Sequence, residues 1–239
     1  MAGRVRVGSG DWARGNRKAG DLVEASVPLE VETPLPYVSR GGEKLAGALD
    51  AFAVDPAGLV CLDVGASTGG FTDLLLQRGA VRVHAIDVGR GQLAEVLRRD
   101  PRVIARERTN ARGLSLALLG EPVALAVIDV SFISLRLILA PTAACLVPGA
   151  RVVALVKPQF EAGRGRAPGG VVRDPAVHRE VLVAALDHAR ASGLAPHGLA
   201  ESPLRGPAGN REFFLLAGAA PCSAEPVDWA ARIADLVPG

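Results

Sequence analysis

The sequence has few cysteines, few aromatic residues and few histidines, and each shortage excludes a class of site. Its three cysteines lie far apart and form no CxxC pair, which excludes a zinc ribbon and a disulfide framework. The four histidines are scattered, so we expect no metal site. With 4% aromatic residues, a broad base-stacking platform is not expected. The net charge is only +2, so any surface that binds nucleic acid must be local.

Long uninterrupted apolar runs are also missing. The longest apolar region, residues 135–156, is broken by Arg136, Pro141, Pro148 and Arg151, so it does not indicate a membrane span. Residues 1–18 are rich in arginine and lack the apolar stretch of a secretory signal. We therefore expect a cytoplasmic protein with no membrane partner, in which Cys61 and Cys145 are plain buried thiols.

The chain does have ample material for a core. It has 239 residues, of which 49% are hydrophobic, and its mean hydropathy is +0.26. This favours one large domain, alone or with a small appendage. Of the 27 basic residues, only Lys18, Lys44 and Lys157 are lysines, which indicates a need for a compact amine at those positions.

The N-terminal segment differs in pattern from the rest. Residues 4–7 and 27–31 alternate like short strands around a basic, turn-rich stretch. We expect a small β-rich appendage and linker over residues 1–36, a main domain over 37–220 and a tail or helix over 221–239.

From residue 37 onward, apolar strands alternate with helical segments, which is typical of a parallel sheet covered on both faces. The expected strands are 59–64, 81–86, 103–105, 124–128, 152–156, 197–201 and 212–216. The expected helices are 44–52, 72–78, 92–99, 115–119, 135–146 and 174–192. The last two strands have no helix between them, so we expect a hairpin-like pair at the end of the sheet.

A glycine-rich turn follows the first of these strands, in the run from Leu62 to Phe71. Such a turn lets a ligand approach the backbone closely, and the following helix offers free N–H groups. Ser67 stands where a dinucleotide fingerprint has its second glycine, which disfavours a pyrophosphate ligand. Asp87, at the end of the next strand, is placed to bind a ribose diol, although it could instead cap a helix.

Two further strands end in charged residues. Asp129 follows the fourth strand and Lys157 follows the fifth, at the edge where open α/β sheets bind ligands. A partly desolvated lysine is a candidate base, or it can simply pair with Asp129 across the strand ends, and both can hold together.

Seven motifs in register resemble the TlyA family of ribosomal RNA 2′-O-methyltransferases, whose members are also called hemolysins. They are SRGGEKL from Ser39, DVGASTGGFT from Asp63, DVGRGQL from Asp87, ERTN from Glu107, DVSFISL from Asp129, KPQFE from Lys157 and GNREF from Gly209. The catalytic domain of that family is similar to the FtsJ/RrmJ type. The resemblance implies a Rossmann-like α/β fold, a mostly parallel seven-stranded sheet with its last strand antiparallel, and S-adenosylmethionine as methyl donor.

The resemblance also implies a catalytic tetrad of Lys44, Asp129, Lys157 and Glu212. A ribose 2′-hydroxyl is a weak acid, so attack on a sulfonium methyl needs its proton removed or the developing alkoxide stabilised. Lys157 could take the proton and Lys44 could help hold the oxyanion. The two carboxylates would orient the amines.

The resemblance also implies the donor site and cytidine in ribosomal RNA as the acceptor, whereas the RNA contacts are expected from the local basic residues. The donor would contact Asp63, Gly65, Ala66, Ser67, Thr68, Gly69, Gly70, Phe71, Asp87, Val88, Asn110 and Asp129. Local cations would contact RNA phosphates, namely Arg40, Arg164, Arg166 and Arg205.

One departure from the family is expected at the N-terminus. Family members begin with a small RNA-binding domain, and residues 1–36 resemble only its closing strands. Three alternatives remain open: a methyltransferase acting on another substrate, a non-catalytic S-adenosylmethionine-binding assembly factor, and a membrane-active hemolysin. The sequence has neither the span nor the basic amphipathic helix that the last would need.

Overall fold

The computed structural model describes residues 5–7, 24–31, 36–163, 165–220 and 227–238. The chain divides into two compact units, residues 1–36 and 37–239. In the first unit, β1 (Val5–Val7) and β2 (Leu29–Val31) form an antiparallel pair in which Arg6 lies opposite Glu30.

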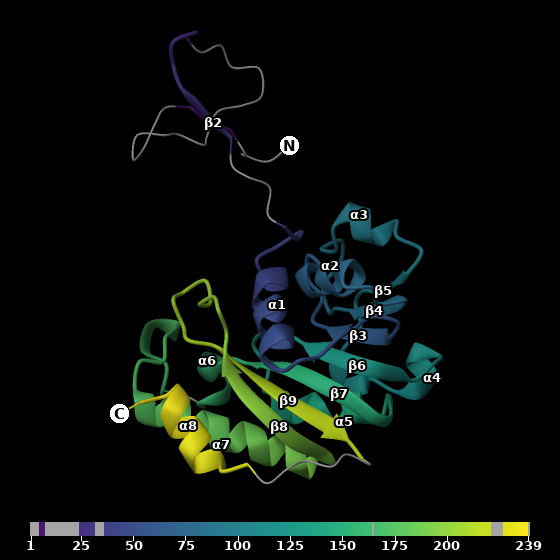
Figure 1. Cartoon of the computed structure of the whole chain (residues 1–239), viewed down its shortest axis with the longest axis vertical. Coiled ribbons are helices and arrows are strands. Elements are labelled where there is room, and N and C mark those ends of the chain that lie inside the picture. The colour runs from purple at the N-terminus through teal and green to yellow at the C-terminus, as the bar shows by residue number, and fades with distance from the viewer. Residues whose placement is uncertain (1–4, 8–23, 32–35, 164, 221–226, 239) are drawn as a thin grey trace. The chain divides into compact units, whose positions relative to one another are not determined.

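The second unit is built on one seven-stranded sheet with the spatial order β5-β4-β3-β6-β7-β9-β8 (Figure 1). Neighbours from β5 to β7 are parallel, and β9 is antiparallel to both β7 and β8. The strands are β3 (Val60–Val64), β4 (Arg82–Ile86), β5 (Val103–Arg106), β6 (Val123–Ile128), β7 (Leu146–Val156), β8 (Leu194–Glu201) and β9 (Phe213–Ala219). This confirms the expected Rossmann-like α/β architecture with an antiparallel last strand.

Helices cover both faces of the sheet (Figure 1). They are α1 (Gly41–Ala51), α2 (Gly70–Gln77), α3 (Glu95–Arg98), α4 (Leu116–Leu119), α5 (Leu139–Ala143), α6 (Pro158–Glu161), α7 (Pro175–Ala191) and α8 (Trp229–Leu236). Residues of α1, α2 and α3 pack into one apolar cluster, and residues of α4, α5, α7 and α8 pack into the other.

The alternation of side chains along β3 shows how one strand serves both layers. Leu62 and Val64 belong to the cluster under α5 and α7, whereas Cys61 belongs to the cluster under α1 and α2. Asp63 therefore faces α2 from within the core, where it is fully buried. Cys61 and Cys145 are buried free thiols as expected, and burial raises the pKa of Cys61 to about 12.

The longest helix, α7, has the start signals that its sequence predicts. The Asp174 side chain accepts a hydrogen bond from the Ala176 N–H, and Pro175 occupies the first turn. A buried stripe at Val177, Val181 and Leu182 packs it on the sheet.

Several expected element lengths are wrong: the helix expected over 92–99 is reduced to α3, and the strands expected over 152–156 and 197–201 are the longer β7 and β8. The segment expected to be one helix over 135–146 forms a 3₁₀ helix at Leu135–Leu137 and the short helix α5, because β7 already begins at Leu146. The early part of β7 is irregular, since its pairing with β6 shifts register between Val123 and Leu125. No helix in the described residues is both long and apolar enough to cross a membrane.

The order of the strands also defines where a ligand can enter. The chain moves outward from β3 to β4 and β5, and then returns to place β6 on the other side of β3. A crevice opens at such a reversal, beyond the carboxyl ends of the two central strands. The glycine-rich turn follows β3 and Asp129 follows β6, so both lie at this crevice.

Candidate functional site

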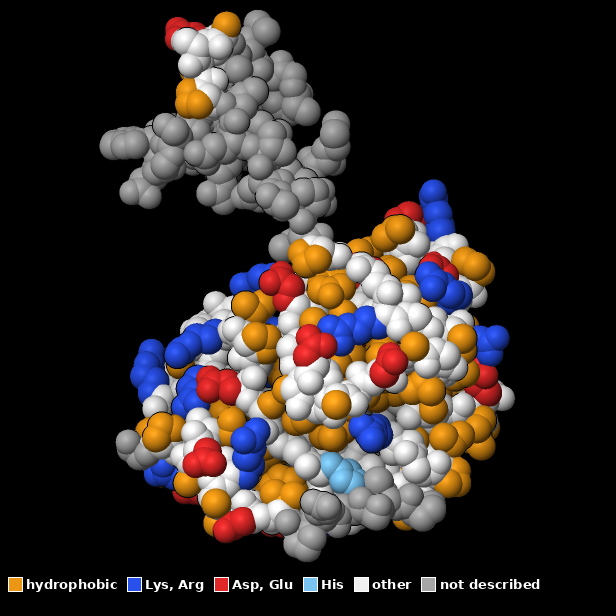
Figure 2. Space-filling view, in the orientation of Figure 1, with side chains coloured by type: hydrophobic (Ala, Val, Ile, Leu, Met, Phe, Trp, Pro, Cys, Tyr) orange, Lys and Arg blue, Asp and Glu red, His pale blue; other side chains and the backbone are white. Residues whose placement is uncertain are grey.

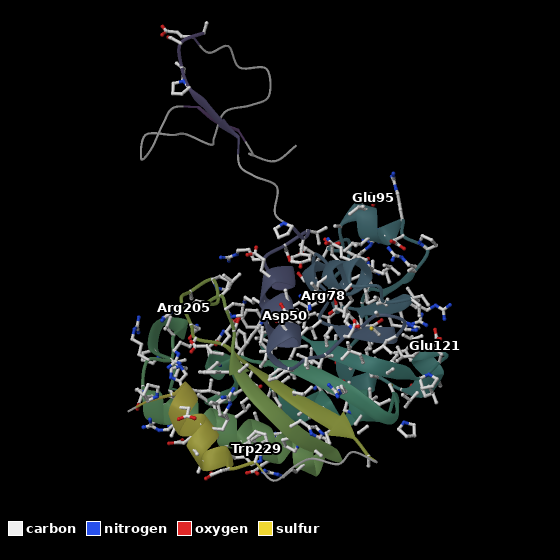
Figure 3. The ribbon with its side chains drawn as sticks, in the orientation of Figure 1. Asp50, Arg78, Glu95, Glu121, Arg205 and Trp229 are labelled. Carbon is white, nitrogen blue, oxygen red and sulfur yellow. The ribbon has the colours of Figure 1, made fainter. Side chains whose placement is uncertain are left out.

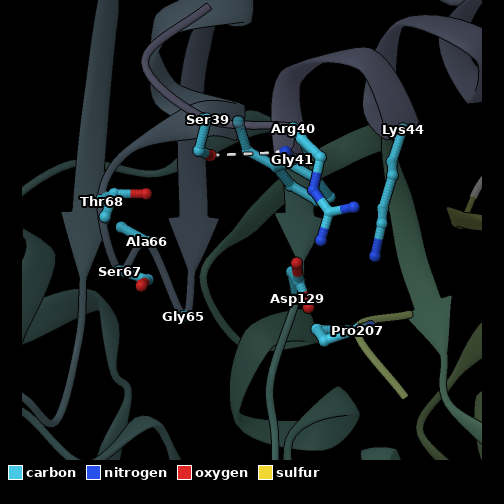
Figure 4. Close-up of a pocket in the computed structure, with 12 residues that line it drawn as sticks. Ser39, Arg40, Gly41, Lys44, Gly65, Ala66, Ser67, Thr68, Asp129 and Pro207 are labelled. Atoms are coloured by element: carbon cyan, nitrogen blue, oxygen red, sulfur yellow. Dashed lines mark hydrogen bonds between the residues drawn. The ribbon is translucent and has the colours of Figure 1, made fainter. Parts of the chain in front are cut away.

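A cavity of about 230 Å³ lies at the reversal point, next to the N-terminal end of α1 (Figure 4). Its walls come from the turn before α1, from α1, from the β3–α2 loop, from the end of β6 and from the β8–β9 loop. They are Ser39, Arg40, Gly41, Lys44, Gly65, Ala66, Ser67, Thr68, Gly70, Phe71, Asp129 and Pro207. The cavity therefore joins four residues of the SRGGEKL motif to the glycine-rich loop.

Two residues of the cavity wall, Lys44 and Asp129, each belong to a lysine–carboxylate pair. The Lys44 Nζ donates to Glu212 Oε2 at 2.6 Å, and both side chains are buried. The Lys157 Nζ forms an ion pair with Asp129 Oδ1 and also donates to Ser131 Oγ at 3.0 Å. Each lysine is thus paired with its own carboxylate, which balances its positive charge.

The four residues come from four separate elements. Lys44 lies on α1, Asp129 follows β6, Lys157 follows β7 and Glu212 directly precedes β9. In Figure 4 the Lys44 and Arg40 side chains project into the opening above Asp129. Because β6 and β7 are parallel neighbours, Asp129 and Lys157 meet at the same sheet edge.

The glycine-rich loop is fitted closely against β6. Gly65 has a φ of +86°, and a Cβ there would lie 2.3 Å from the backbone oxygen of Asp129. The N–H groups of Gly65 and Ala66 both donate to the Ile86 carbonyl, at 2.8 and 3.1 Å. The loop can therefore present its backbone to a ligand only because position 65 carries no side chain.

Asp63 supports this loop from behind, and it is absent from the cavity wall. Its Oδ2 accepts a hydrogen bond from Thr72 Oγ1 at 2.7 Å, and its Oδ1 has no hydrogen-bond partner among the described residues. Burial, and to a smaller extent the nearby Asp129, raises the pKa of Asp63 to about 7 although the Thr72 hydrogen bond lowers it. A carboxyl group in such surroundings favours its protonated form.

Asp87 links the glycine-rich loop to the loop after β4. Its Oδ2 accepts from the Ser67 N–H at 2.8 Å and its Oδ1 accepts from the Gly89 N–H at 2.6 Å. Carboxylate oxygens have further lone pairs, so a ribose diol can still bind there. The next residue, Val88, is 69% exposed.

The Asn110 side chain is an N-cap in this structure. Its Oδ1 accepts a hydrogen bond from the Arg112 N–H at 3.0 Å, at the start of a 3₁₀ helix. The turn chemistry that is common for asparagine in a loop therefore occurs here, and the expected adenine contact stays a prediction.

The four candidate RNA-binding arginines have different surroundings. Arg40 lines the cavity, and Arg205 lies exposed on the β8–β9 loop (Figure 3). Arg166 instead pairs with Glu180 of α7 at 2.5 Å, which competes with a phosphate contact. Arg164 lies outside the described residues. Figure 2 shows Lys and Arg side chains spread over this face of the domain, in keeping with a low net charge.

Sequence reasoning missed several residues at the site, although they lie inside the quoted motifs. Ser131 accepts a hydrogen bond from Lys157. Phe132 is 89% exposed with a φ of +63°, a rare combination for an aromatic residue, and its ring lies 4.9 Å from that of Phe160. In the sequence, only the strand-end residues Asp129 and Lys157 indicated that the segment containing Ser131 and Phe132 lies near the site.

The histidines do not contribute to the site. His84 and His178 are buried, and burial lowers the pKa of both, which keeps them neutral in the core. Among the described residues, no group of three or more His, Cys, Asp or Glu side chains could hold a metal ion.

The chain is similar to known proteins. The sequence model of the FtsJ-like methyltransferase family matches residues 37–219. The chain is 48% identical to the 16S/23S rRNA (cytidine-2′-O)-methyltransferase TlyA of Mycobacterium tuberculosis, over 90% of this chain and 80% of that protein.

Two solved structures described as hemolysins are also similar. One, from Lactococcus lactis, has a TM-score of 0.80 and 43% identity, and the match covers 84% of this chain and 99% of the other. The second, from Streptococcus thermophilus, has a TM-score of 0.81 and 39% identity, covering 98% and 86%.

Proposed function

This chain belongs to the FtsJ-like methyltransferase family, and on that basis we propose that it methylates a ribose 2′-hydroxyl of ribosomal RNA, using S-adenosylmethionine, with cytidine as the acceptor. The observation that carries the proposal is that Lys44 and Asp129 line one cavity and belong to two separate lysine–carboxylate pairs, Lys44–Glu212 and Lys157–Asp129. If ribosomal RNA is the substrate, the protein acts in the cytoplasm.

The glycine-rich loop and Asp87 fit the methyl donor. Gly65 brings bare backbone to the cavity, Asp87 offers carboxylate oxygens at the ribose position, and the exposed Val88 offers an apolar surface beside it. When bound, S-adenosylmethionine supplies an electrophilic methyl group on a sulfonium. The chain's task is then to hold the acceptor oxygen in line with that group.

The two lysines divide the work on the acceptor hydroxyl. Lys157, held by Asp129 and Ser131, acts as the base in its neutral form: its ammonium first gives a proton to solvent, and the free amine then receives the hydroxyl proton. Lys44, held by Glu212, donates a hydrogen bond that stabilises the charge developing on the oxygen. The carboxylates fix the positions of the amines and offset their charge.

Contacts to the RNA would come from cations at the rim and from one aromatic ring. Arg40 at the cavity and Arg205 on the β8–β9 loop are placed to bind phosphates, and Arg166 could do so after leaving Glu180. Phe132, beside the catalytic strand ends, offers a face on which the acceptor base can stack. We propose that the unit of residues 1–36 adds further RNA contacts.

The test is methyl transfer from labelled S-adenosylmethionine to ribosomal subunits that lack the modification. We expect label in RNA that nuclease digestion assigns to a 2′-O-methylcytidine. Lys157→Ala and Lys44→Ala should each lower kcat by about 100-fold or more, while donor affinity stays within about threefold. Arg99→Ala, which removes an exposed partner of Glu95, serves as the matched control and should keep full activity.

Three results would contradict the proposal. The first is no transfer to either subunit by a wild-type protein that binds the donor. The second is label on a base instead of a ribose. The third is full activity in Lys157→Ala.

A further inference from the structure

Two loop segments beyond the catalytic strands run together over several residues. One follows β6 and contains residues 129–135, and the other follows β7 and contains residues 157–161. Lys157 contacts Asp129 and Ser131 at the start of both segments. Phe160 packs on Phe132 one step further, with ring centroids 4.9 Å apart. The contacts thus advance in the same direction along both segments.

Glu161 makes the last contacts in this series. Its Oε2 accepts a hydrogen bond from Ser134 Oγ at 2.7 Å, and its Oε1 accepts one from the Leu135 N–H at 2.8 Å. One carboxylate therefore ties α6 to the start of the 3₁₀ helix Leu135–Leu137. Leu135 and Pro158, one on each segment, are buried, so both segments are also anchored in the core.

The loop between these ties is strained. Phe132 has a φ of +63°, a conformation that residues with a side chain seldom adopt, and its ring is 89% exposed. Burial of the ring therefore does not explain the conformation. Such strain persists only where surrounding contacts hold the backbone on both sides. Here Asp129 and Ser131 are held by Lys157 on one side, and Ser134 and Leu135 are held by Glu161 on the other.

We propose that Glu161 is a positioning residue for methyl transfer. It fixes the loop of residues 131–135 against α6, and through that loop it sets the position of Ser131 beside Lys157 and the orientation of the Phe132 ring. This inference rests on the proposed function, since the group to be positioned is the acceptor nucleotide. Glu161 itself is not among the residues that line the cavity, and its carboxylate accepts its hydrogen bonds from Ser134 and Leu135.

The expected effects follow from what each substitution leaves in place. Glu161→Ala removes both acceptors, so the loop is released from α6. Glu161→Gln keeps an acceptor for the Leu135 N–H, and its amide N–H can donate to the Ser134 hydroxyl, which accepts as well as donates. Ser134→Ala removes one of the two bonds to Glu161, together with the hydrogen bond that Ser134 Oγ accepts from the Arg136 N–H. The loop of residues 131–135 should therefore become more mobile in the order Glu161→Gln, Ser134→Ala, Glu161→Ala.

The experiment measures steady-state methylation of unmodified ribosomal subunits by the full chain, with S-adenosylmethionine and RNA varied in turn. Glu161→Ala should raise the KM for RNA and lower kcat, each by about tenfold, with the KM for S-adenosylmethionine unchanged. Glu161→Gln should restore both parameters to within about threefold of wild type. Hydrogen exchange should show faster exchange at residues 131–137 in Glu161→Ala than in wild type or Glu161→Gln.

Glu121→Ala is the matched control. Glu121 also accepts bonds from two partners, Arg82 and His84, and it lies across the domain from the site (Figure 3). It should lower thermal stability and leave both KM values unchanged. If Glu161→Ala behaves like Glu121→Ala, or if Glu161→Gln fails to restore activity while folding normally, Glu161 has only a structural role and the inference is wrong. An inactive wild type would instead contradict the proposed function, and exchange at residues 131–137 would still test whether Glu161 holds the loop.

Discussion

Gly206 lies so close to Glu212 that a Cβ at position 206 would be 2.6 Å from Glu212 Oε1. Glu212 is 1% exposed, and its other oxygen accepts the hydrogen bond from Lys44. The β8–β9 loop therefore packs against the Glu212 carboxylate. Because Glu212 holds Lys44, the position of Lys44 at the cavity depends on Gly206 having no side chain.

Gly206→Ala should impair catalysis more than donor binding. The added methyl must displace the Glu212 carboxylate or the loop, and either movement weakens the bond to Lys44. We expect kcat to fall by about tenfold or more, with the dissociation constant for S-adenosylmethionine within about threefold of wild type. Steady-state kinetics and calorimetric titration of the donor would measure this. Gly113→Ala, where a Cβ would meet open space, should be neutral.

Gly65→Ala should have the opposite pattern and abolish donor binding. A Cβ there would lie 2.3 Å from the Asp129 backbone oxygen, and alanine at a φ of +86° costs a further 1–2 kcal/mol, roughly. Calorimetric titration should show no binding by a protein that remains folded by circular dichroism. Gly58→Ala is the matched control, since Gly58 has a φ of +74° with nothing within 4 Å, so it carries the strain without the clash. Wild-type donor affinity in Gly65→Ala would show that the loop does not need this approach.

The pH dependence of stability should carry the signature of Asp63. Its pKa of about 7 in the folded protein lies above the value of about 3.9 expected in the unfolded chain. The stabilisation is therefore complete below pH 4 and is lost as pH rises towards 7, because ionisation leaves a buried charge. One pKa unit corresponds to about 1.4 kcal/mol, so the loss is on the order of a few kcal/mol.

Denaturant unfolding of the donor-free protein between pH 5 and 8 would measure this effect. Asp63→Asn keeps an acceptor for Thr72 and cannot ionise, so its stability should change less over this range than that of wild type. Asp187→Asn, at an exposed position on α7, should follow the wild-type curve. Parallel curves for wild type and Asp63→Asn would mean that Asp63 does not titrate in this range.

The sequence was informative wherever function depends on local pattern. Apolar strands that end at Asp87, Asp129 and Lys157 predicted the parallel sheet and the edge at which ligands bind, because strand periodicity and strand ends are local properties. The pairing of Lys157 with Asp129 was one of two interpretations considered for that lysine, and the structure shows the pair.

Non-local contacts could not be predicted in the same way. Arg166 was expected to be available for phosphate, but it meets Glu180 because α7 folds back beside its loop. Glu161 ends the KPQFE motif, and its structural role could not be predicted because its partners Ser134 and Leu135 lie 27 and 26 residues away. The positive φ of Phe132 depends on the same contacts between residues distant in sequence. The conformational preference of phenylalanine therefore could not predict it.

The Asn210 side chain links the β8–β9 loop to the segment that leads into α7, and we expect this link to hold that segment in place. It is 2% exposed, its Oδ1 accepts from the Val172 N–H at 3.0 Å, and its Nδ2 donates to the Gly170 carbonyl at 2.8 Å. Glu212 follows two residues later, so this amide joins the segment of Gly170 and Val172 to the carboxylate that pairs with Lys44.

Asn210→Ala would leave a buried donor unpaired, at a cost of about 1–3 kcal/mol. We expect a lower melting temperature, faster hydrogen exchange at residues 170–173, and a raised KM for RNA with donor affinity unchanged. Asn210→Asp should be no better than alanine, because a carboxylate can accept from Val172 but repels the Gly170 carbonyl. Arg205→Ala, an exposed change in the same loop, controls for stability and should leave the melting temperature unchanged. Wild-type exchange at residues 170–173 in Asn210→Ala would mean that the core packing of Val172 alone holds this segment.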